Sequence, residues 1–136
     1  MEKLIKGGEE LGIEISPDKV EKYRRYLELL IEKNSITNLT AIREEDEIIE
    51  KHFIDSIALS KLIPASVKNA IDIGTGAGFP GLALAIMMPE IKFTLMDSIE
   101  KKTEFLRDTA DELGLKNVEV VTSRAEDYIK KGKREL

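Results

Sequence analysis

One stretch decides the fold: Ala70-Ile71-Asp72-Ile73-Gly74-Thr75-Gly76-Ala77-Gly78-Phe79-Pro80-Gly81. Its first four residues are typical of a buried strand, and its glycines allow a tight turn into a helix that begins near Pro80. Such a loop brings the backbone close to a ligand at the start of a helix. A turn that binds nothing is the alternative, but it needs only one or two glycines. The sequence therefore predicts a ligand-binding loop.

Strands and helices alternate after this loop. Residues 91–96 read as a second strand, 99–113 as a helix closed by Gly114, and 118–122 as a third strand. This βαβαβ series predicts an α/β fold with a parallel sheet and right-handed crossovers. Three strands are half of a doubly wound sheet, and the first strand should lie at its centre. We therefore expect a truncated sheet whose first strand has a free edge that favours self-association.

The chain before the first strand is helical. Ser16 and Pro17 predict a helix start, with Ser as N-cap and Pro as the first helical residue, and apolar residues keep a helical spacing until Asn34. A second helical pattern runs from about Glu44 to residue 62 and stops before Pro64. We divide the chain into an N-terminal helical region, 1–66, and a partial sheet domain, 67–136.

Composition narrows the class of protein. The chain has 136 residues, of which 42% are hydrophobic and 35% charged, as expected of a globular domain. It has no cysteine, so disulfides and thiolate metal sites are excluded, and we expect no metal. The charged N-terminus does not look like a signal peptide and no apolar run could span a bilayer, so we expect a cytoplasmic protein without a membrane partner. The net charge of −5 limits any nucleic-acid contact to a local patch.

Two aspartates indicate which ligand the loop binds. Asp97 ends the second strand, where its carboxylate can accept hydrogen bonds from ribose hydroxyls; it could instead cap the next helix, although Ser98 could cap equally well. The glycines also match the G-x-G-x-x-G of nicotinamide and flavin enzymes, so a nucleotide-dependent oxidoreductase stays open. Asp72 lies inside the strand, where a dinucleotide fold has an apolar residue. This pattern is similar to motif I of the class I S-adenosylmethionine-dependent methyltransferases.

Four stretches in order carry a closer resemblance: Asn38-Leu39-Thr40-Ala41-Ile42, Lys51-His52-Phe53-Ile54-Asp55-Ser56, residues 72–81, and Arg124-Ala125-Glu126. Together they resemble the glucose-inhibited division protein B family, the guanine-N7 methyltransferases of bacterial small-subunit ribosomal RNA. The resemblance implies a Rossmann-like methyltransferase sheet, S-adenosylmethionine as cofactor and small-subunit ribosomal RNA as partner. Family members continue with four more strands and further cofactor and RNA contacts. A non-catalytic fragment that binds S-adenosylmethionine or RNA is therefore the alternative for this short chain.

The resemblance also implies roles for individual residues. Gly74 and Phe79 line the methionine side of the cofactor, Asp97 holds the ribose, and Ala125 and Glu126 lie along the adenine. The complete set of expected cofactor-binding residues is Asp72, Gly74, Gly76, Gly78, Phe79, Asp97, Ser98, Ala125 and Glu126.

Candidates on the substrate side are Asn38, His52 and Asp55. His52 shares a helix face with Asp55 and Ser56, so the three could form a hydrogen-bonded cluster that is either structural or part of the methyl-transfer site. Asn38 could reach the target base or only stabilise a turn. Residues 101–102, both Lys, could contact RNA phosphate or form a solvated helix face. No general base is expected, since guanine N7 already carries a free lone pair.

Overall fold

The computed structural model describes residues 1–135, with side chains described as far as Lys130. The elements in chain order are α1 (Glu2–Glu10), α2 (Pro17–Asn34), α3 (Glu45–Glu47), the π-helix η1 (Ile48–Ile54), α4 (Asp55–Leu59), the 3-10 helix η2 (Ser60–Leu62), β1 (Asn69–Ile73), α5 (Gly81–Met87), β2 (Lys92–Asp97), α6 (Glu100–Leu113), β3 (Val118–Thr122) and α7 (Ala125–Glu135). The predicted α/β class is confirmed.

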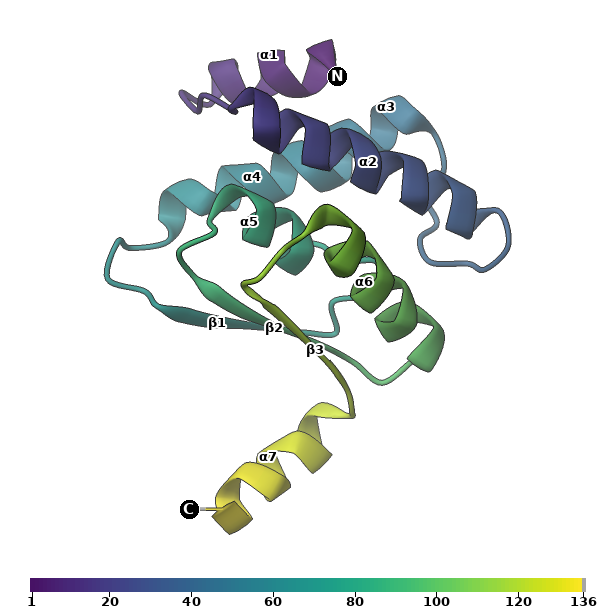
Figure 1. The fold of residues 1–136 in the computed structure, drawn as a ribbon, viewed down its shortest axis with the longest axis vertical. Helices are drawn as coiled ribbons and strands as arrows, with labels where there is room; N and C mark the ends of the chain where they lie inside the picture. The colour runs from purple at the N-terminus through teal and green to yellow at the C-terminus, as the bar shows by residue number, and fades with distance from the viewer. Residues whose placement is uncertain (136) are drawn as a thin grey trace.

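The three strands form one parallel sheet in the order β1-β2-β3. Helices α2, α4, α5 and α6 lie on one side of this sheet, and α7 extends away on the opposite side (Figure 1). Within residues 1–135, β1 has a hydrogen-bonded neighbour on one side only, as the sequence predicted. All three strands end at the same edge of the sheet, which is where the glycine loop begins.

The predicted start of α2 and the predicted end of α6 are confirmed. The Ser16 hydroxyl accepts a hydrogen bond from the Lys19 amide at 3.3 Å, and Pro17 occupies the first helical position of α2. Gly114 ends α6 in the left-handed conformation, with φ of 68°. These signals act through local backbone geometry, so the sequence alone reveals them.

Three helical features differ from the sequence-based expectation, and one of them is α7, since no helix was predicted after the third strand. Helix α1 was not predicted, because the poor helix formers Gly7 and Gly8 lie within it. A β-carbon at Gly7 would collide with Ile54, so this glycine lets α1 pack closely on η1. The second predicted helix spans the expected residues but includes a π-helical segment, Ile48–Ile54, in place of regular α-helix.

A single hydrophobic core joins the helical region to the sheet. Tyr23, Tyr26 and Phe53 are completely buried and pack with Leu95 of β2 in the same cluster. The buried Tyr23 hydroxyl donates to the Ala83 carbonyl at 2.6 Å, so α2 is fastened to α5. The core thus fixes the helices against the strand ends that carry the glycine loop.

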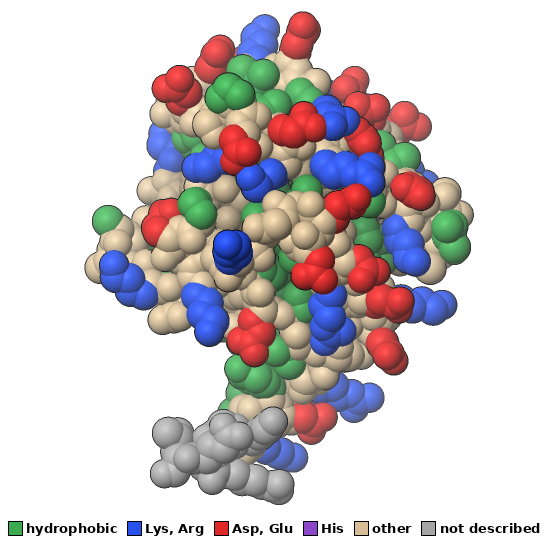
Figure 2. All heavy atoms as spheres, viewed as in Figure 1, with side chains coloured by type: hydrophobic (Ala, Val, Ile, Leu, Met, Phe, Trp, Pro, Cys, Tyr) green, Lys and Arg blue, Asp and Glu red, His purple; other side chains and the backbone are tan. Residues whose placement is uncertain are grey.

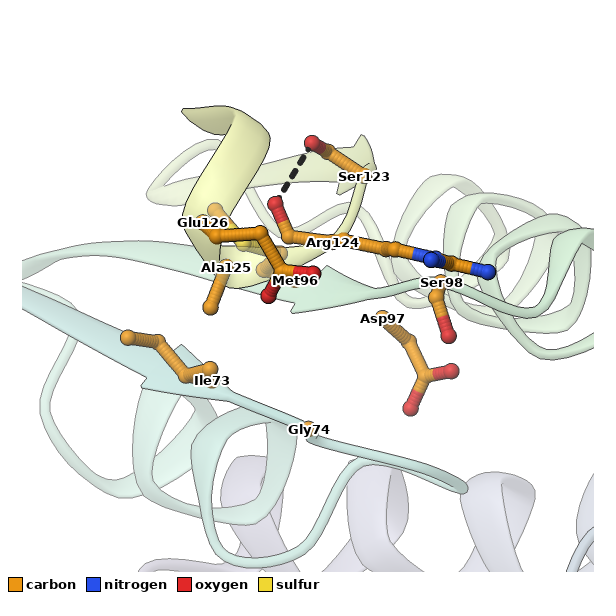
Figure 3. A pocket seen from close by; sticks show the side chains of 9 residues that line it. All are labelled: Ile73, Gly74, Met96, Asp97, Ser98, Ser123, Arg124, Ala125 and Glu126. Carbon is orange, nitrogen blue, oxygen red and sulfur yellow. Dashed lines mark hydrogen bonds between the residues drawn. The ribbon is translucent and has the colours of Figure 1, made fainter. Parts of the chain in front are cut away.

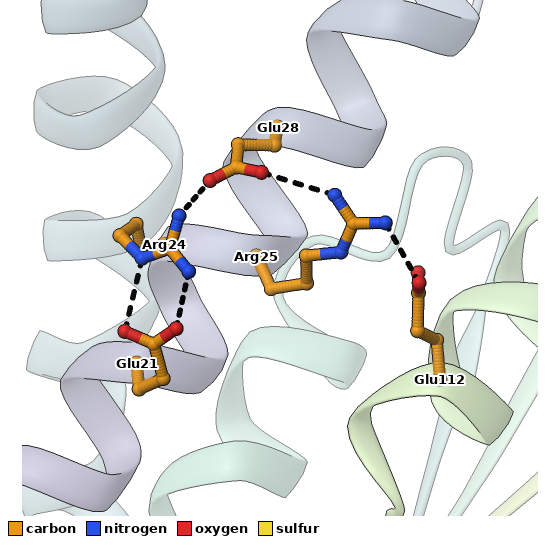
Figure 4. Close-up of polar contacts among 5 residues, drawn as sticks. All are labelled: Glu21, Arg24, Arg25, Glu28 and Glu112. Atoms are coloured by element: carbon orange, nitrogen blue, oxygen red, sulfur yellow. Dashed lines mark hydrogen bonds and ion pairs between the residues drawn. The ribbon is translucent and has the colours of Figure 1, made fainter.

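Ion pairs add a weaker link between α2 and α6. Arg25 bonds to Glu112 of α6 at 2.7 Å and to Glu28 at 3.0 Å, while Arg24 bridges Glu28 and Glu21 (Figure 4). These side chains are partly exposed, so each pair contributes about 0–1 kcal/mol. Acidic and basic side chains alternate over this face (Figure 2). No helix in the described chain combines the length and apolar character needed to cross a membrane.

Candidate functional site

Asp97 joins the glycine loop to the start of α6. It is the last residue of β2 and is largely buried. One carboxylate oxygen accepts the Gly76 amide and the other accepts the Ile99 amide, each at 2.9 Å. The N-cap residue of α6 is Ile99, whose side chain makes no capping hydrogen bond. Neither Asp97 nor the exposed Ser98 therefore acts as the N-cap. Asp97 instead fixes the relative positions of the loop and the helix.

The carboxylate of Asp72, a residue of β1, lies at the N-terminus of α5. It accepts the Gly81 amide at 2.9 Å from a half-buried position. Burial raises the pKa of Asp72; the hydrogen bond from the Gly81 amide opposes this rise, and the nearby Asp97 charge adds to it. The Thr75 hydroxyl oxygen is also buried, and in the described part of the chain no partner meets hydrogen-bond geometry with it. Asp72 thus places a carboxylate where a helix would otherwise attract an anion.

Most amides of the loop are used within the protein. The Gly74 and Thr75 amides donate to the Met96 carbonyl at 2.8 and 3.0 Å. The Gly78 and Phe79 amides donate to the Thr75 carbonyl at 2.9 and 3.2 Å. A phosphate-binding loop instead points its amides at the ligand. This loop is therefore poorly suited to a pyrophosphate group.

The glycines of the loop divide into two kinds. Gly74 and Gly76 have positive φ angles of 73° and 59°, and a β-carbon added to either would have open space around it. Gly78 also has a positive φ, but an added β-carbon would strike the Tyr26 hydroxyl. Gly81 is closed in by Leu95. Gly74 and Gly76 therefore form the surface that a ligand can approach, whereas Gly78 and Gly81 permit close packing.

A cavity of about 370 Å³ lies at the carboxyl ends of the strands. This is where open α/β sheets bind their ligands. Its lining residues are Ile73, Gly74, Met96, Asp97, Ser98, Ser123, Arg124, Ala125 and Glu126. The cavity lies between Ile73 of β1, Asp97 of β2 and Glu126 of α7 (Figure 3).

This cavity brings together five of the nine expected cofactor-binding residues: Gly74, Asp97, Ser98, Ala125 and Glu126. Four further residues line the cavity although they were not predicted from the sequence, namely Ile73, Met96, Ser123 and Arg124. All four lie within two residues of the carboxyl end of a strand, and that position was the signal that could have identified them.

Phe79 lies away from the cavity lining, inside an aromatic stack. Its ring is nearly parallel to His52, with centroids 4.2 Å apart, and to Tyr26, with centroids 5.3 Å apart. The Tyr26 hydroxyl also donates to the Ala77 carbonyl at 2.6 Å. The stack therefore holds the glycine loop from its core side and connects it to α2 and η1.

His52 does not form the expected cluster with Asp55 and Ser56. Among the described residues its hydrogen bond is to the Thr40 hydroxyl, with 3.0 Å between Nε2 and Oγ1. The expectation was wrong because it assumed α-helical spacing, whereas η1 has i to i+5 hydrogen bonds that change which residues share a face. Burial lowers the pKa of His52, and the nearby Asp55 charge partly opposes this. Asp55 is exposed and lies beside α1, outside this contact.

Asn38 lies on an exposed loop between α2 and α3. Its side-chain oxygen accepts a hydrogen bond from Arg43 at 2.5 Å, and Arg43 also donates to the Asn34 carbonyl at 3.1 Å. A second hollow, of about 360 Å³, is lined by Ile36, Thr37, Asn38, Leu39, Ile99, Lys101 and Lys102. The structure thus places Asn38 beside the two lysines, whereas Asp55 is not part of this group.

Comparison with known proteins identifies the family. The model of the family described as rRNA small subunit methyltransferase G matches residues 19–136. The ribosomal RNA small subunit methyltransferase G of Fusobacterium nucleatum is 55% identical over 124 residues, which are 91% of this chain and 53% of the relative. The proteins of the same name from Clostridium perfringens and Ectopseudomonas mendocina are each 47% identical, over 94% and 93% of this chain and 54% and 59% of their own lengths.

The chain therefore spans about half the length of the curated relatives it matches. The resemblance carried by the four sequence stretches is confirmed, because the family match includes all of them. The chain belongs to the rRNA small subunit methyltransferase G family.

Proposed function

We propose that this chain forms the cofactor-binding part of an enzyme that transfers a methyl group from S-adenosylmethionine to N7 of a guanine in small-subunit ribosomal RNA. The observation that carries the proposal is Asp97, whose carboxylate is fixed by two amides at the edge of the strand-end cavity. An enzyme with this substrate works in the bacterial cytoplasm.

The donors and acceptors around the cavity fit S-adenosylmethionine. Each oxygen of Asp97 receives one amide and keeps further lone pairs, which can accept the ribose hydroxyls. Gly74 leaves the cavity floor open, and Ile73 and Met96 offer apolar surface. Ala125 and Glu126 line the same cavity and are the residues that we propose to contact the adenine. Bound here, the cofactor supplies a methyl group activated by a sulfonium centre.

A nicotinamide cofactor fits the same loop poorly. Its pyrophosphate requires free amides and a helix N-terminus, but the loop amides are used internally and the Asp72 carboxylate occupies the start of α5. Like charges would repel each other at this point. These contacts favour S-adenosylmethionine over the oxidoreductase alternative.

The protein's task on the substrate side is positioning. Guanine N7 carries its own lone pair, so no residue needs to remove a proton before methyl transfer. The lowered pKa of His52 keeps its ring neutral at neutral pH, where it supports Phe79 and the loop. Catalysis would then depend on holding the base in line with the methyl group.

Calorimetry with S-adenosylmethionine tests the cofactor site. Asp97→Ala should weaken binding about tenfold or more, because it removes charge-assisted hydrogen bonds. Asp108→Ala, which alters an exposed carboxylate on α6, is the matched control and should bind like the unchanged chain. Equal affinity of the Asp97 variant, or tighter binding of a nicotinamide dinucleotide than of S-adenosylmethionine, would contradict the proposal.

A methyl-transfer assay on small-subunit ribosomal RNA tests the second part of the proposal. Transfer by the 136-residue chain would show that this part of the protein is sufficient for catalysis. Binding of S-adenosylmethionine without transfer would instead assign the non-catalytic alternative to this chain.

A further inference from the structure

The second hollow, beside the cofactor cavity, has the features of a base-binding site. We propose that it receives the target guanine after the base leaves its RNA stack, and that Asn38 selects guanine over adenine. This inference rests on the proposed function, because it takes the neighbouring cavity as the cofactor site.

The two cavities border successive residues at the junction of β2 and α6, although no lining residue is common to both. Asp97 lines the cofactor cavity, and its carboxylate is hydrogen-bonded to the amide of Ile99, which lines the second hollow. A base in the second hollow would therefore lie next to the cofactor. Transfer of a group between two bound molecules requires such neighbouring sites.

The loop that carries Asn38 is held in place by hydrogen bonds. The buried Asn34 side-chain oxygen accepts the amides of Leu39 and Thr40 at 2.9 and 3.1 Å. The Thr40 hydroxyl in turn bonds to His52, which stacks on Phe79 of the glycine loop. Asn38 is thus positioned relative to the cofactor loop before any substrate arrives.

The hydrogen bond from Arg43 decides which end of the Asn38 amide is free to bind a ligand. A guanidinium group can only donate, so the atom that it contacts must be the Asn38 oxygen. The Asn38 NH₂ group is then left to donate to a ligand. Guanine presents its O6 as an acceptor, whereas adenine presents an amino group at the same position. Asn38 would therefore hydrogen-bond to guanine and face a second donor on adenine.

The rim of the hollow suits a nucleotide in single-stranded RNA. Ile36 is 75% exposed and Ile99 is 48% exposed, and these apolar side chains can contact the faces of an extruded base. Lys101 and Lys102 supply positive charge for the phosphates, and neither forms an ion pair within the described chain.

A neighbouring hollow shows the opposite character. It also borders Ile36 and α6, but its charged lining consists of Glu32, Asp108 and Glu112 against one lysine, Lys33. Three carboxylates would repel RNA phosphates. Of the two hollows beside Ile36, the one lined by Asn38 therefore matches the nucleotide.

Binding of guanosine and adenosine 5′-monophosphates, measured by NMR titration, tests the inference. The titrations are run with and without saturating S-adenosylhomocysteine, which occupies the cofactor cavity and keeps adenine out of it. The unchanged chain should bind the guanosine nucleotide about fivefold more tightly than the adenosine nucleotide. Guanine gains a hydrogen bond from Asn38, whereas adenine would place a second donor against the Asn38 NH₂ group. Equal affinity for the two nucleotides, or no binding of either, would overturn the proposal.

Three variants separate base selection from phosphate attraction. Asn38→Asp keeps the contact with Arg43 but replaces the NH₂ donor by an acceptor, so the preference for guanosine should disappear or reverse. Lys102→Ala should weaken the binding of both nucleotides by a similar factor, because it removes a positive charge that attracts the phosphate. Lys116→Ala, at an exposed position beyond the other end of α6, should change neither affinity. A retained guanosine preference in Asn38→Asp would rule out Asn38 as the selecting residue.

The same samples distinguish this inference from the proposed function. If S-adenosylhomocysteine binds but the guanosine preference is absent, the base-selection inference fails and the cofactor assignment remains. If S-adenosylhomocysteine does not bind but the preference depends on Asn38, the cofactor assignment fails and the hollow remains a guanine site.

Discussion

Gly74 and Gly78 have similar backbone requirements but different surroundings, and their alanine variants should therefore behave differently. Gly74→Ala should cost about 1–2 kcal/mol of stability, for its positive φ alone, and should strongly weaken S-adenosylmethionine binding because the new methyl group enters the open side of the loop. Gly78→Ala should cost about 3 kcal/mol or more, because its methyl group also meets Tyr26 and Leu82 in the core. Urea unfolding and calorimetry measure the two effects.

Gly114→Ala is the matched control for the backbone cost. Gly114 has a φ of 68° and open space around it, but it lies at the end of α6, away from the glycine loop. This variant should lose as much stability as Gly74→Ala and bind S-adenosylmethionine normally. Unchanged binding in Gly74→Ala would show that the ligand does not contact that face of the loop.

His52, the only histidine, should make stability depend on pH just below neutrality. Burial lowers its pKa below the ordinary 6.5, so as the pH falls through 6.5 the unfolded chain binds a proton before the folded protein does. The free energy of unfolding should therefore decrease across this window and level off below the folded pKa. Urea midpoints at about pH 7.5 and about pH 5.5 measure the decrease.

His52→Gln isolates this contribution. Glutamine does not titrate, and its amide can still bond to the Thr40 hydroxyl, so the difference between the two midpoints should become smaller. An unchanged pH dependence in this variant would assign the effect to the carboxyl groups instead.

At the scale of the elements, the Ser16 cap should stabilise α2. The hydroxyl satisfies the Lys19 amide, so Ser16→Ala should lower the free energy of unfolding by about 1 kcal/mol. Ser66→Ala removes an exposed hydroxyl from a turn and should change stability little. Urea denaturation compares the two; equal midpoints would show that the cap contributes nothing measurable.

Regular elements were predictable because their signals are local. Ser16, Pro17 and Gly114 set the ends of helices through backbone geometry, and β3 was predicted at its observed residues. Helix α1 was missed because Gly7 serves close packing against Ile54, a contact between distant segments. The π-helical form of η1 was missed because apolar spacing does not distinguish it from an α-helix, and α7 was not predicted either. Helical spacing alone cannot show that a glycine serves close packing.

The candidate site was predictable to a similar extent. Asp97 and Glu126 follow from strand ends and from the family pattern, and both line the cavity. The stack of Tyr26, His52 and Phe79 could not be predicted, since it joins residues from three separate segments. Its signal in the sequence is an ordinary helical spacing of apolar residues, which also fits a plain core.

At the scale of the whole molecule, one face of the sheet is covered far less than the other. Helices α5 and α6 pack on one face of the sheet (Figure 1). Ile71 and Ile73 alternate along β1 with Asp72, which contacts Gly81 of α5, so they face the other side, where they are 46% and 54% exposed. Strand β1 also has a free edge among the described strands. An exposed apolar face beside an unpaired strand favours association with another chain.

We therefore propose that this chain associates with itself through β1. Its average mass in sedimentation should rise with protein concentration, and Ile71→Lys should reduce this rise because it places a charge on the exposed face beside the free edge. Ile5→Lys changes a partly exposed isoleucine on α1, on the helical side of the molecule, and should leave the association unchanged. A monomer at all concentrations would contradict the proposal, whereas equal effects of the two variants would assign association to general surface hydrophobicity rather than to the sheet edge.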